Sequence, residues 1–125
     1  MNLSPRSEKN LVGVHPKLEA IVRLAAVRPE IEFLVTEGLR TVERQRQLVA
    51  AGASQTMNSK HITGHAVDLA AVVDGEVRWD WPLYPKLAAA MKRAAADLGI
   101  TITWGGDWTS LKDGPHFEID PKAYP

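Results

Sequence analysis

Two short stretches of the sequence hold most of the side chains that could do chemistry. The first is SKHITGHAVD at residues 59–68, and the second is WGGDWTSLKDGPHFE at residues 104–118. Together they contain three of the four histidines of a chain that has no cysteine. Since thiolates are absent, a metal ion would have to be held by histidine, aspartate or glutamate. The two stretches are therefore where a metal site is to be sought.

His61, Asp68 and His116 form the candidate ligand set. His61 lies in a polar, irregular stretch, while Asp68 and His116 each lie at the start of a segment typical of a strand. Two adjacent strands would bring the three side chains to one cation. Two neutral imidazoles and one carboxylate are a known catalytic zinc set, which leaves a fourth position for a water molecule of lowered pKa. The set predicts a hydrolase with one zinc ion per chain.

Asp113 and Arg40 are the candidates for the other catalytic tasks. Peptide hydrolysis needs a group that takes the proton of the attacking water and passes it to the leaving amine, and Asp113 lies three residues before His116. Arg40, at a predicted junction of strand and helix, is a cation suited to stabilise the oxyanion. Taken singly, Asp113-Gly114 is also an ordinary turn, and an arginine after Gly38 is more often a surface residue.

The other two histidines are left outside the ligand set. His61 and His65 are four residues apart, as in the HExxH zinc helix, but Ile62 occupies the place of its glutamate. Gly64 also makes a helix through the pair unfavourable. We therefore predict that His65 supports the site from outside or takes no part in it, and that His15 is a surface residue.

Hydrophobic periodicity predicts both helices and strands. After a polar start, helices are predicted at residues 16–28, from a Thr41 cap to about residue 51, and at 85–98 before Gly99. Strands are predicted at residues 31–36, 66–73, 76–81, 100–104 and 116–119, with a hairpin turn at Asp74-Gly75 and an irregular loop over 53–63. Trp104 is expected in the core, and Trp108 at the wall of a substrate groove.

Length and composition predict a single domain over residues 1–125. The chain is 45% hydrophobic and 24% charged, which is ordinary for a globular protein. Fifteen basic residues balance fifteen acidic ones, so we expect no nucleic-acid partner. No apolar run is long enough to span a membrane and the amino terminus has no signal-peptide core, so we expect cytoplasmic synthesis and no membrane insertion.

The two stretches resemble the motifs of a known peptidase family. SKHITGHAVD is similar to the S-x-H-x-x-G-x-A-x-D motif of zinc D-alanyl-D-alanine carboxypeptidases and dipeptidases, and DGPHFE is similar to their second motif. GLRT at residues 38–41 resembles the G-x-R segment of the family. The compact length, the WGGDW stretch and the DGPHFE ending are most similar to the L-alanyl-D-glutamate peptidase branch, which includes bacteriophage endolysins.

The resemblance implies a fold and a role for each candidate residue. The fold implied is α+β, a small antiparallel sheet with helices packed on one side and a single zinc site at its open face. By motif position, His61, Asp68 and His116 bind zinc, Asp113 is catalytic and Arg40 supports the transition state. Many relatives have glutamate at the position of Asp113, and the shorter acid favours the endolysin branch.

The resemblance also implies a biological setting. We expect an endolysin that cuts the L-alanyl-D-glutamate bond of peptidoglycan stem peptides and lyses the host. It would act as a monomer, without a separate cell-wall-binding domain, and would accumulate in the host cytoplasm until a holin-type partner permeabilises the membrane. Two alternatives remain open: a D,D-carboxypeptidase or D-Ala-D-Ala dipeptidase, and a non-catalytic zinc-containing wall-binding module related to hedgehog-type domains.

Overall fold

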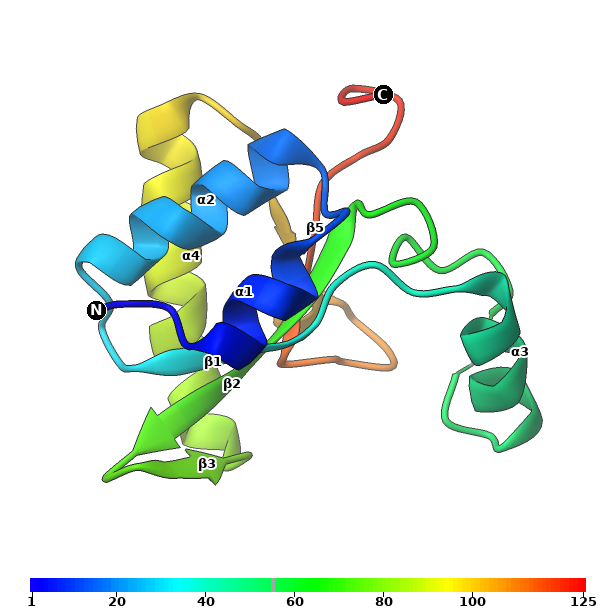
Figure 1. Cartoon of the computed structure of the whole chain (residues 1–125), viewed down its shortest axis with the longest axis horizontal. Coiled ribbons are helices and arrows are strands. Elements are labelled where there is room, and N and C mark those ends of the chain that lie inside the picture. The colour runs from blue at the N-terminus through cyan, green and yellow to red at the C-terminus, as the bar shows by residue number, and fades with distance from the viewer. Residues whose placement is uncertain (55) are drawn as a thin grey trace.

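An antiparallel sheet lies at the centre of the computed structural model, which describes residues 1–54 and 56–125 (Figure 1). The strand order is β1-β2-β5-β4, and β3 extends β2 as a hairpin. The strands are β1 (Phe33–Glu37), β2 (Ala66–Val73), β3 (Glu76–Arg78), β4 (Thr103–Trp104) and β5 (His116–Glu118). The helices are α1 (Pro5–Leu11), α2 (Pro16–Val27), α3 (Val42–Ala50) and α4 (Tyr84–Leu98). The expected α+β fold is confirmed.

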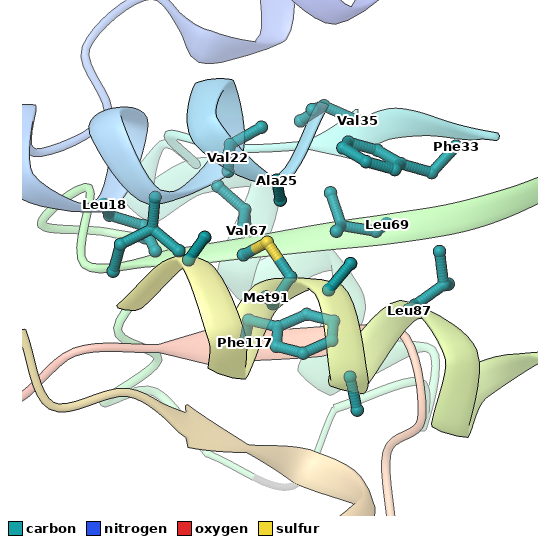
Figure 2. Close-up of a cluster of buried hydrophobic side chains, with 14 of the residues drawn as sticks. Leu18, Val22, Ala25, Phe33, Val35, Val67, Leu69, Leu87, Met91 and Phe117 are labelled. Atoms are coloured by element: carbon teal, nitrogen blue, oxygen red, sulfur yellow. The ribbon is translucent and has the colours of Figure 1, made fainter. Parts of the chain in front are cut away.

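Side-chain alternation along the strands separates a core face from an open face. Val67 and Leu69 of β2 and Phe117 of β5 are fully buried in the hydrophobic core. Figure 2 shows Met91 of α4 lying next to Val67 and Phe117, so the core fills the space between the sheet and the helices. Because successive residues of a strand point to opposite faces, Asp68 projects from the other side of the sheet. The helical cover on one side is confirmed.

Local sequence signals fix the ends of the predicted helices. Pro16 occupies the first turn of α2, and the Thr41 side chain accepts a hydrogen bond from the Arg44 N–H at the start of α3. The helix α4 ends at Gly99, whose φ of 69° is the left-handed conformation that glycine adopts most easily. Among residues 1–54 and 56–125, no helix is long and apolar enough to cross a membrane.

Two of the predicted strands are shorter than expected. The segment 76–81 pairs with β2 only as far as Arg78, and Trp81 begins a short 3-10 helix in which Pro82 fixes the backbone. Of residues 100–104, only Thr103 and Trp104 form a strand, because they alone lie opposite β5. In both cases the apolar residues of the sequence pattern continue past the last residue that pairs with the neighbouring strand.

The polar start of the chain contains a helix that the sequence analysis missed. Ser4 caps α1 by accepting a hydrogen bond from the Ser7 N–H, and Pro5 occupies the first turn. The helix lies against the edge strand β1, as Figure 1 shows. Ser7 Oγ accepts from the Val35 N–H at 2.9 Å, and Asn10 donates to the Val35 carbonyl at 2.9 Å. The helix therefore satisfies backbone groups that an edge strand leaves unpaired.

Replacing Ser7 with alanine is expected to lower the free energy of unfolding by about 1–3 kcal/mol, since the buried Val35 N–H would lose its partner. Urea unfolding followed by circular dichroism measures the change. Lys9→Ala, on the exposed side of α1, is the control and should change stability by less than about 0.5 kcal/mol. Equal stability of the two variants would show that α1 does not protect the strand edge.

Candidate active site

The pairing of β2 with β5 brings two of the predicted ligands together. Asp68 and His116 are directly opposite one another in the antiparallel register. His116 Nδ1 lies 3.4 Å from Asp68 Oδ1. The side chain of His116 is 9% exposed and that of Asp68 is 21% exposed, so both are held inside the protein at the floor of a groove.

His61 reaches the same carboxylate from a turn. Gly64 has a φ of 78°, which lets the backbone double back between His61 and β2, and no helix forms through His61 and His65. His61 Nδ1 donates to the Gly38 carbonyl at 2.9 Å, because a carbonyl oxygen can only accept. Its other ring nitrogen, Nε2, lies 3.3 Å from Asp68 Oδ1.

Glu118 fixes the orientation of the second histidine. His116 Nε2 donates to Glu118 Oε1 at 2.7 Å, which leaves Nδ1 of the neutral ring as the nitrogen that faces Asp68. Burial alone would raise the pKa of Glu118, but its hydrogen bonds with His116 and Lys60 hold that pKa below its usual range. A carboxylate behind a ligand histidine is a common support for metal binding.

These three residues fit a metal ion. One ring nitrogen of each histidine faces Asp68 Oδ1, which is buried and has no hydrogen-bond partner with good geometry among the residues that the structure describes. The three ligand atoms lie within 4.8 Å of one another. A buried carboxylate oxygen in this position is unfavourable unless a metal ion binds it or a protonated histidine donates to it. The cluster therefore has the composition and geometry of an open two-histidine, one-carboxylate metal site.

The charges around the cluster show that the site favours a positive charge. Burial disfavours ionised Asp68, but the two histidines outweigh this and lower its pKa well below the usual range. Burial likewise disfavours a charged His116, yet the carboxylates of Asp68 and Glu118 on either side raise its pKa to about 9. A metal ion and a proton would compete for the same place.

Asp113 lies in the same groove, where its environment raises the pKa of its carboxyl group. Burial raises the pKa of its carboxyl group, and the charge of Asp68 raises it further, against smaller opposing effects of His116, His61 and Arg40. Its backbone is held in place by a hydrogen bond from its N–H to the Gly105 carbonyl at 3.1 Å. A carboxyl group with a raised pKa takes up a proton more readily than an exposed aspartate does, which suits a general base.

Arg40 is held beside the ligand cluster rather than in solvent. Its guanidinium forms two 2.7 Å hydrogen bonds with the Glu37 carboxylate and donates to Gln45 Oε1 at 2.7 Å. Nη2 lies 4.0 Å from Asp68 Oδ2, and the side chain is 9% exposed. The alternative interpretation, that Arg40 is an ordinary surface arginine, is therefore wrong.

A groove of about 810 Å³ contains all five predicted site residues. One wall comes from Leu48 of α3 and from residues 53, 54, 56 and 58–60, and the other from the loop around Trp108 and Leu111. The histidines, Asp68 and Glu118 lie between these walls. The Trp108 ring lies against the His116 ring, with centroids 5.2 Å apart and planes tilted by 45°, which agrees with its expected place in a groove wall. Trp104 is buried in the core as predicted.

The remaining two histidines have structural contacts. His65 Nε2 lies 2.7 Å from the Tyr124 carbonyl and its Nδ1 lies 2.7 Å from Thr63 Oγ1, so both ring nitrogens are used away from the cluster. His15 is half-buried rather than simply exposed. Its Nδ1 accepts from the Lys17 N–H at the start of α2, and its Nε2 lies 3.0 Å from the Pro125 carbonyl.

Two residues of the site were missed by the sequence analysis. Glu118 lies two positions after His116, and strand periodicity could have placed both on one face. Glu37, the partner of Arg40, gave no such signal. A β-bulge between Val35 and Glu37 changes the register, so Glu37 lies opposite Asp68 although regular alternation would place it on the core side.

The fold is that of the D-Ala-D-Ala metallopeptidases, and the His61, Asp68 and His116 cluster could hold a metal ion. The chain superposes on the D,D-pentapeptidase VanY from a VanB-type resistance cassette, solved in complex with Zn(II), with a TM-score of 0.56 at 18% identity, over 85% of this chain and 72% of that one. At this identity the likeness shows the fold. The comparisons that show the family are much closer.

The chain belongs to the phage L-alanyl-D-glutamate peptidase family, whose model matches residues 1–124. It is 35% identical over 122 residues to the L-alanyl-D-glutamate peptidase of Escherichia phage T5, covering 94% of this chain and 88% of the relative. It is also similar to the Serratia marcescens L-Ala D-Glu endopeptidase ChiX, with 50% identity and a TM-score of 0.93, over 100% of this chain and 94% of that structure.

The ligand assignment predicts which histidines are needed to retain zinc. His61→Ala and His116→Ala should each lose most of the metal, because two ligands cannot hold it as three do. His65→Ala should lower thermal stability but keep the metal, since its contacts lie elsewhere. Elemental analysis of purified variants after dialysis measures the zinc content, with one ion per chain expected for the unmodified protein. Retention in His61→Ala with loss in His65→Ala would reverse the assignment.

Proposed function

We propose that the protein is a zinc-dependent endolysin that hydrolyses the L-alanyl-D-glutamate bond of peptidoglycan stem peptides. The family match supports the bond and the substrate. The single observation that carries the chemistry is the buried Asp68 oxygen between two histidine nitrogens, at the floor of an open groove. That arrangement is suited to hold a metal ion where an extended peptide can reach it.

His61, Asp68 and His116 would hold the zinc ion. Zinc bound by three protein ligands supplies a Lewis acid and a water molecule of lowered pKa at its open position. The protein's part is to present the ligands in the correct form. The Gly38 carbonyl and the Glu118 carboxylate each take one N–H of a ligand histidine, so the remaining nitrogen of each ring is free to bind.

Asp113 would act as the general base and then as the general acid. A carboxylate beside the cluster takes a proton from the attacking water and delivers it to the amine of D-glutamate as the bond breaks. The raised pKa of Asp113 supports this role, because a carboxyl group that protonates easily can both accept and return the proton. The peptide must lie in the groove between Asp113 and the ligand cluster for this transfer.

Arg40 would stabilise the negative charge that develops on the scissile carbonyl oxygen. Its guanidinium is close to Asp68 and is fixed by Glu37 and Gln45, so little reorganisation is needed during the reaction. The Glu37 carboxylate offsets part of its charge. Arg40 would therefore act mainly as a fixed hydrogen-bond donor to the carbonyl oxygen, and less through its net positive charge.

Two alternatives are less well supported. A D,D-carboxypeptidase shares the fold, but the family model that matches the chain and the relatives from phage T5 and Serratia marcescens are L-alanyl-D-glutamate peptidases. A zinc-containing binding module would have no need of a carboxyl group with a raised pKa beside the cluster, and Asp113 is such a group.

The similarity to a phage peptidase supports a proposal for the biological setting. We propose that residues 1–125 work as one catalytic domain and as a monomer. The protein would accumulate in the host cytoplasm and reach the wall after a holin-type partner permeabilises the membrane. Peptidoglycan would then be its substrate, and loss of wall integrity would lyse the host.

Replacing Asp113 with asparagine should preserve the fold and the zinc content but lower kcat by roughly 10²- to 10⁴-fold, the usual scale of general acid-base catalysis. Asparagine suits the turn before Pro115 as well as aspartate does, so only the proton transfer is removed. Turnover of a soluble stem peptide, followed by chromatography, measures the effect, and KM should change much less.

Asp107→Asn is the matched control, because Asp107 is an exposed aspartate of the same segment that lies outside the groove lining. Its turnover should stay within about twofold of the unmodified protein. Full activity in zinc-loaded Asp113→Asn would remove Asp113 from the mechanism.

Digestion of peptidoglycan should produce new amino-terminal D-glutamate and new carboxyl-terminal L-alanine. Mass spectrometry of the released fragments, after labelling of free amines, identifies both ends. The zinc chelator 1,10-phenanthroline should abolish the new ends, and added zinc should restore them. Release of D-alanine alone would assign the protein to the D,D-carboxypeptidase alternative.

A further inference from the structure

The substrate of the proposed reaction carries a negative charge next to the bond that is cut. Glutamate has two carboxyl groups, and the continuing peptide chain uses only one of them. Whichever one is used, the other remains on the residue that follows the scissile bond. An enzyme that cuts before D-glutamate therefore gains selectivity if a cation in its groove pairs with this free carboxylate.

Three cationic side chains line the groove, and two of them already have acidic partners. Arg40 is paired with Glu37, and Lys60 is paired with Glu118. Both pairs are tied to the metal cluster, through Asp68 and His116 respectively. A substrate carboxylate that displaced either partner would disturb the catalytic residues.

Lys112 is the third cation, and its position differs. It lines the same groove but has no acidic group within 4.0 Å among residues 1–54 and 56–125. It immediately precedes Asp113, the group proposed to return the proton to the amine of D-glutamate. The free carboxylate of that same D-glutamate must therefore lie near this part of the groove.

The loop that carries Lys112 is fixed at its base. The N–H groups of Trp108 and Asp113 both donate to the Gly105 carbonyl, at 3.3 and 3.1 Å, which closes the loop. Gly105 is required there, because a Cβ atom would lie 2.3 Å from the Asp113 carbonyl oxygen. Lys112 is adjacent to this closed base, so its backbone is held while its long side chain remains free to meet a ligand.

The tip of the loop has an unusual conformation. Leu111 has a φ of 52°, which is uncommon for a leucine, and is 72% exposed although it is apolar. A residue in this conformation costs free energy that the rest of the loop must offset. In this conformation both Leu111 and Lys112 line the groove.

We propose that Lys112 forms a carboxylate subsite that binds the free carboxyl group of D-glutamate and so selects stem peptides in which that group is ionised. The subsite rests on the proposed function, since it needs glutamate after the scissile bond. It makes Lys112 a residue for substrate specificity, separate from the residues assigned to zinc binding and proton transfer.

The experiment compares two soluble stem peptides that differ only in this group, one with the free carboxylate and one with a carboxamide. The unmodified, zinc-loaded protein should favour the carboxylate peptide in kcat/KM by roughly 5- to 20-fold, the range of a partly solvated, charge-assisted hydrogen bond. In Lys112→Met the preference should fall to within about twofold of unity, mainly through a higher KM for the carboxylate peptide. Lys112→Glu should reverse the preference.

Lys86→Met is the matched control, because Lys86 is an exposed lysine of α4 outside the groove, and it should keep the preference of the unmodified protein. The subsite is overturned if Lys112→Met keeps that preference, if it loses activity equally on both peptides, or if the unmodified protein does not distinguish them. If the unmodified protein cuts neither peptide before D-glutamate, the proposed function itself fails and the subsite fails with it. Product identification by mass spectrometry separates these outcomes.

Discussion

The antiparallel register of β2 against β5 is the constraint on which the rest of the structure depends. It places Asp68 opposite His116 on the open face and Val67 opposite Phe117 in the core. A shift of one residue in either strand would exchange the two faces, burying a carboxylate among apolar side chains and exposing a core residue. The hydrophobic core therefore specifies the geometry of the metal site on the opposite face of the sheet.

The helix that was not expected also supports the ligands. The backbone oxygen of Asn10 in α1 lies 2.0 Å from where a Cβ atom of Gly38 would be, so only glycine fits between α1 and the groove. The Gly38 carbonyl in turn accepts the hydrogen bond that sets the tautomer of His61. Glycine at position 38, in the G-x-R segment, is thus required for packing against α1, and its carbonyl orients a ligand histidine. Placement of α1 against the sheet is part of how a ligand histidine is oriented.

The sequence allowed the main elements and the location of the site to be predicted, because both depend on local patterns. Helical periodicity and capping residues identified α2, α3 and α4, and strand patterns identified the two segments that carry Asp68 and His116. Their pairing in the structure agrees with the supposition that these strands are adjacent. The features that were missed depend on irregular or tertiary structure. The bulge that turns Glu37 towards Arg40 leaves no trace in an alternating pattern. The helix α1 has only seven residues, too few for its periodicity to be apparent.

The wall of the groove formed around α3 is joined to the site through a polar residue rather than through the apolar core. Gln45 is the buried residue of α3, which lies apart from the other helices in Figure 1. Its Oε1 accepts from Arg40, and its Nε2 donates to Ser54 Oγ and to the Thr56 carbonyl.

A groove wall that is held by hydrogen bonds opens at a lower free-energy cost than a wall that is held by buried apolar area. Because the same amide contacts Arg40 and the wall, movement of the wall would change the support of the guanidinium. The position of this wall and the orientation of Arg40 are therefore coupled, while the strands that carry Asp68 and His116 remain fixed by the core.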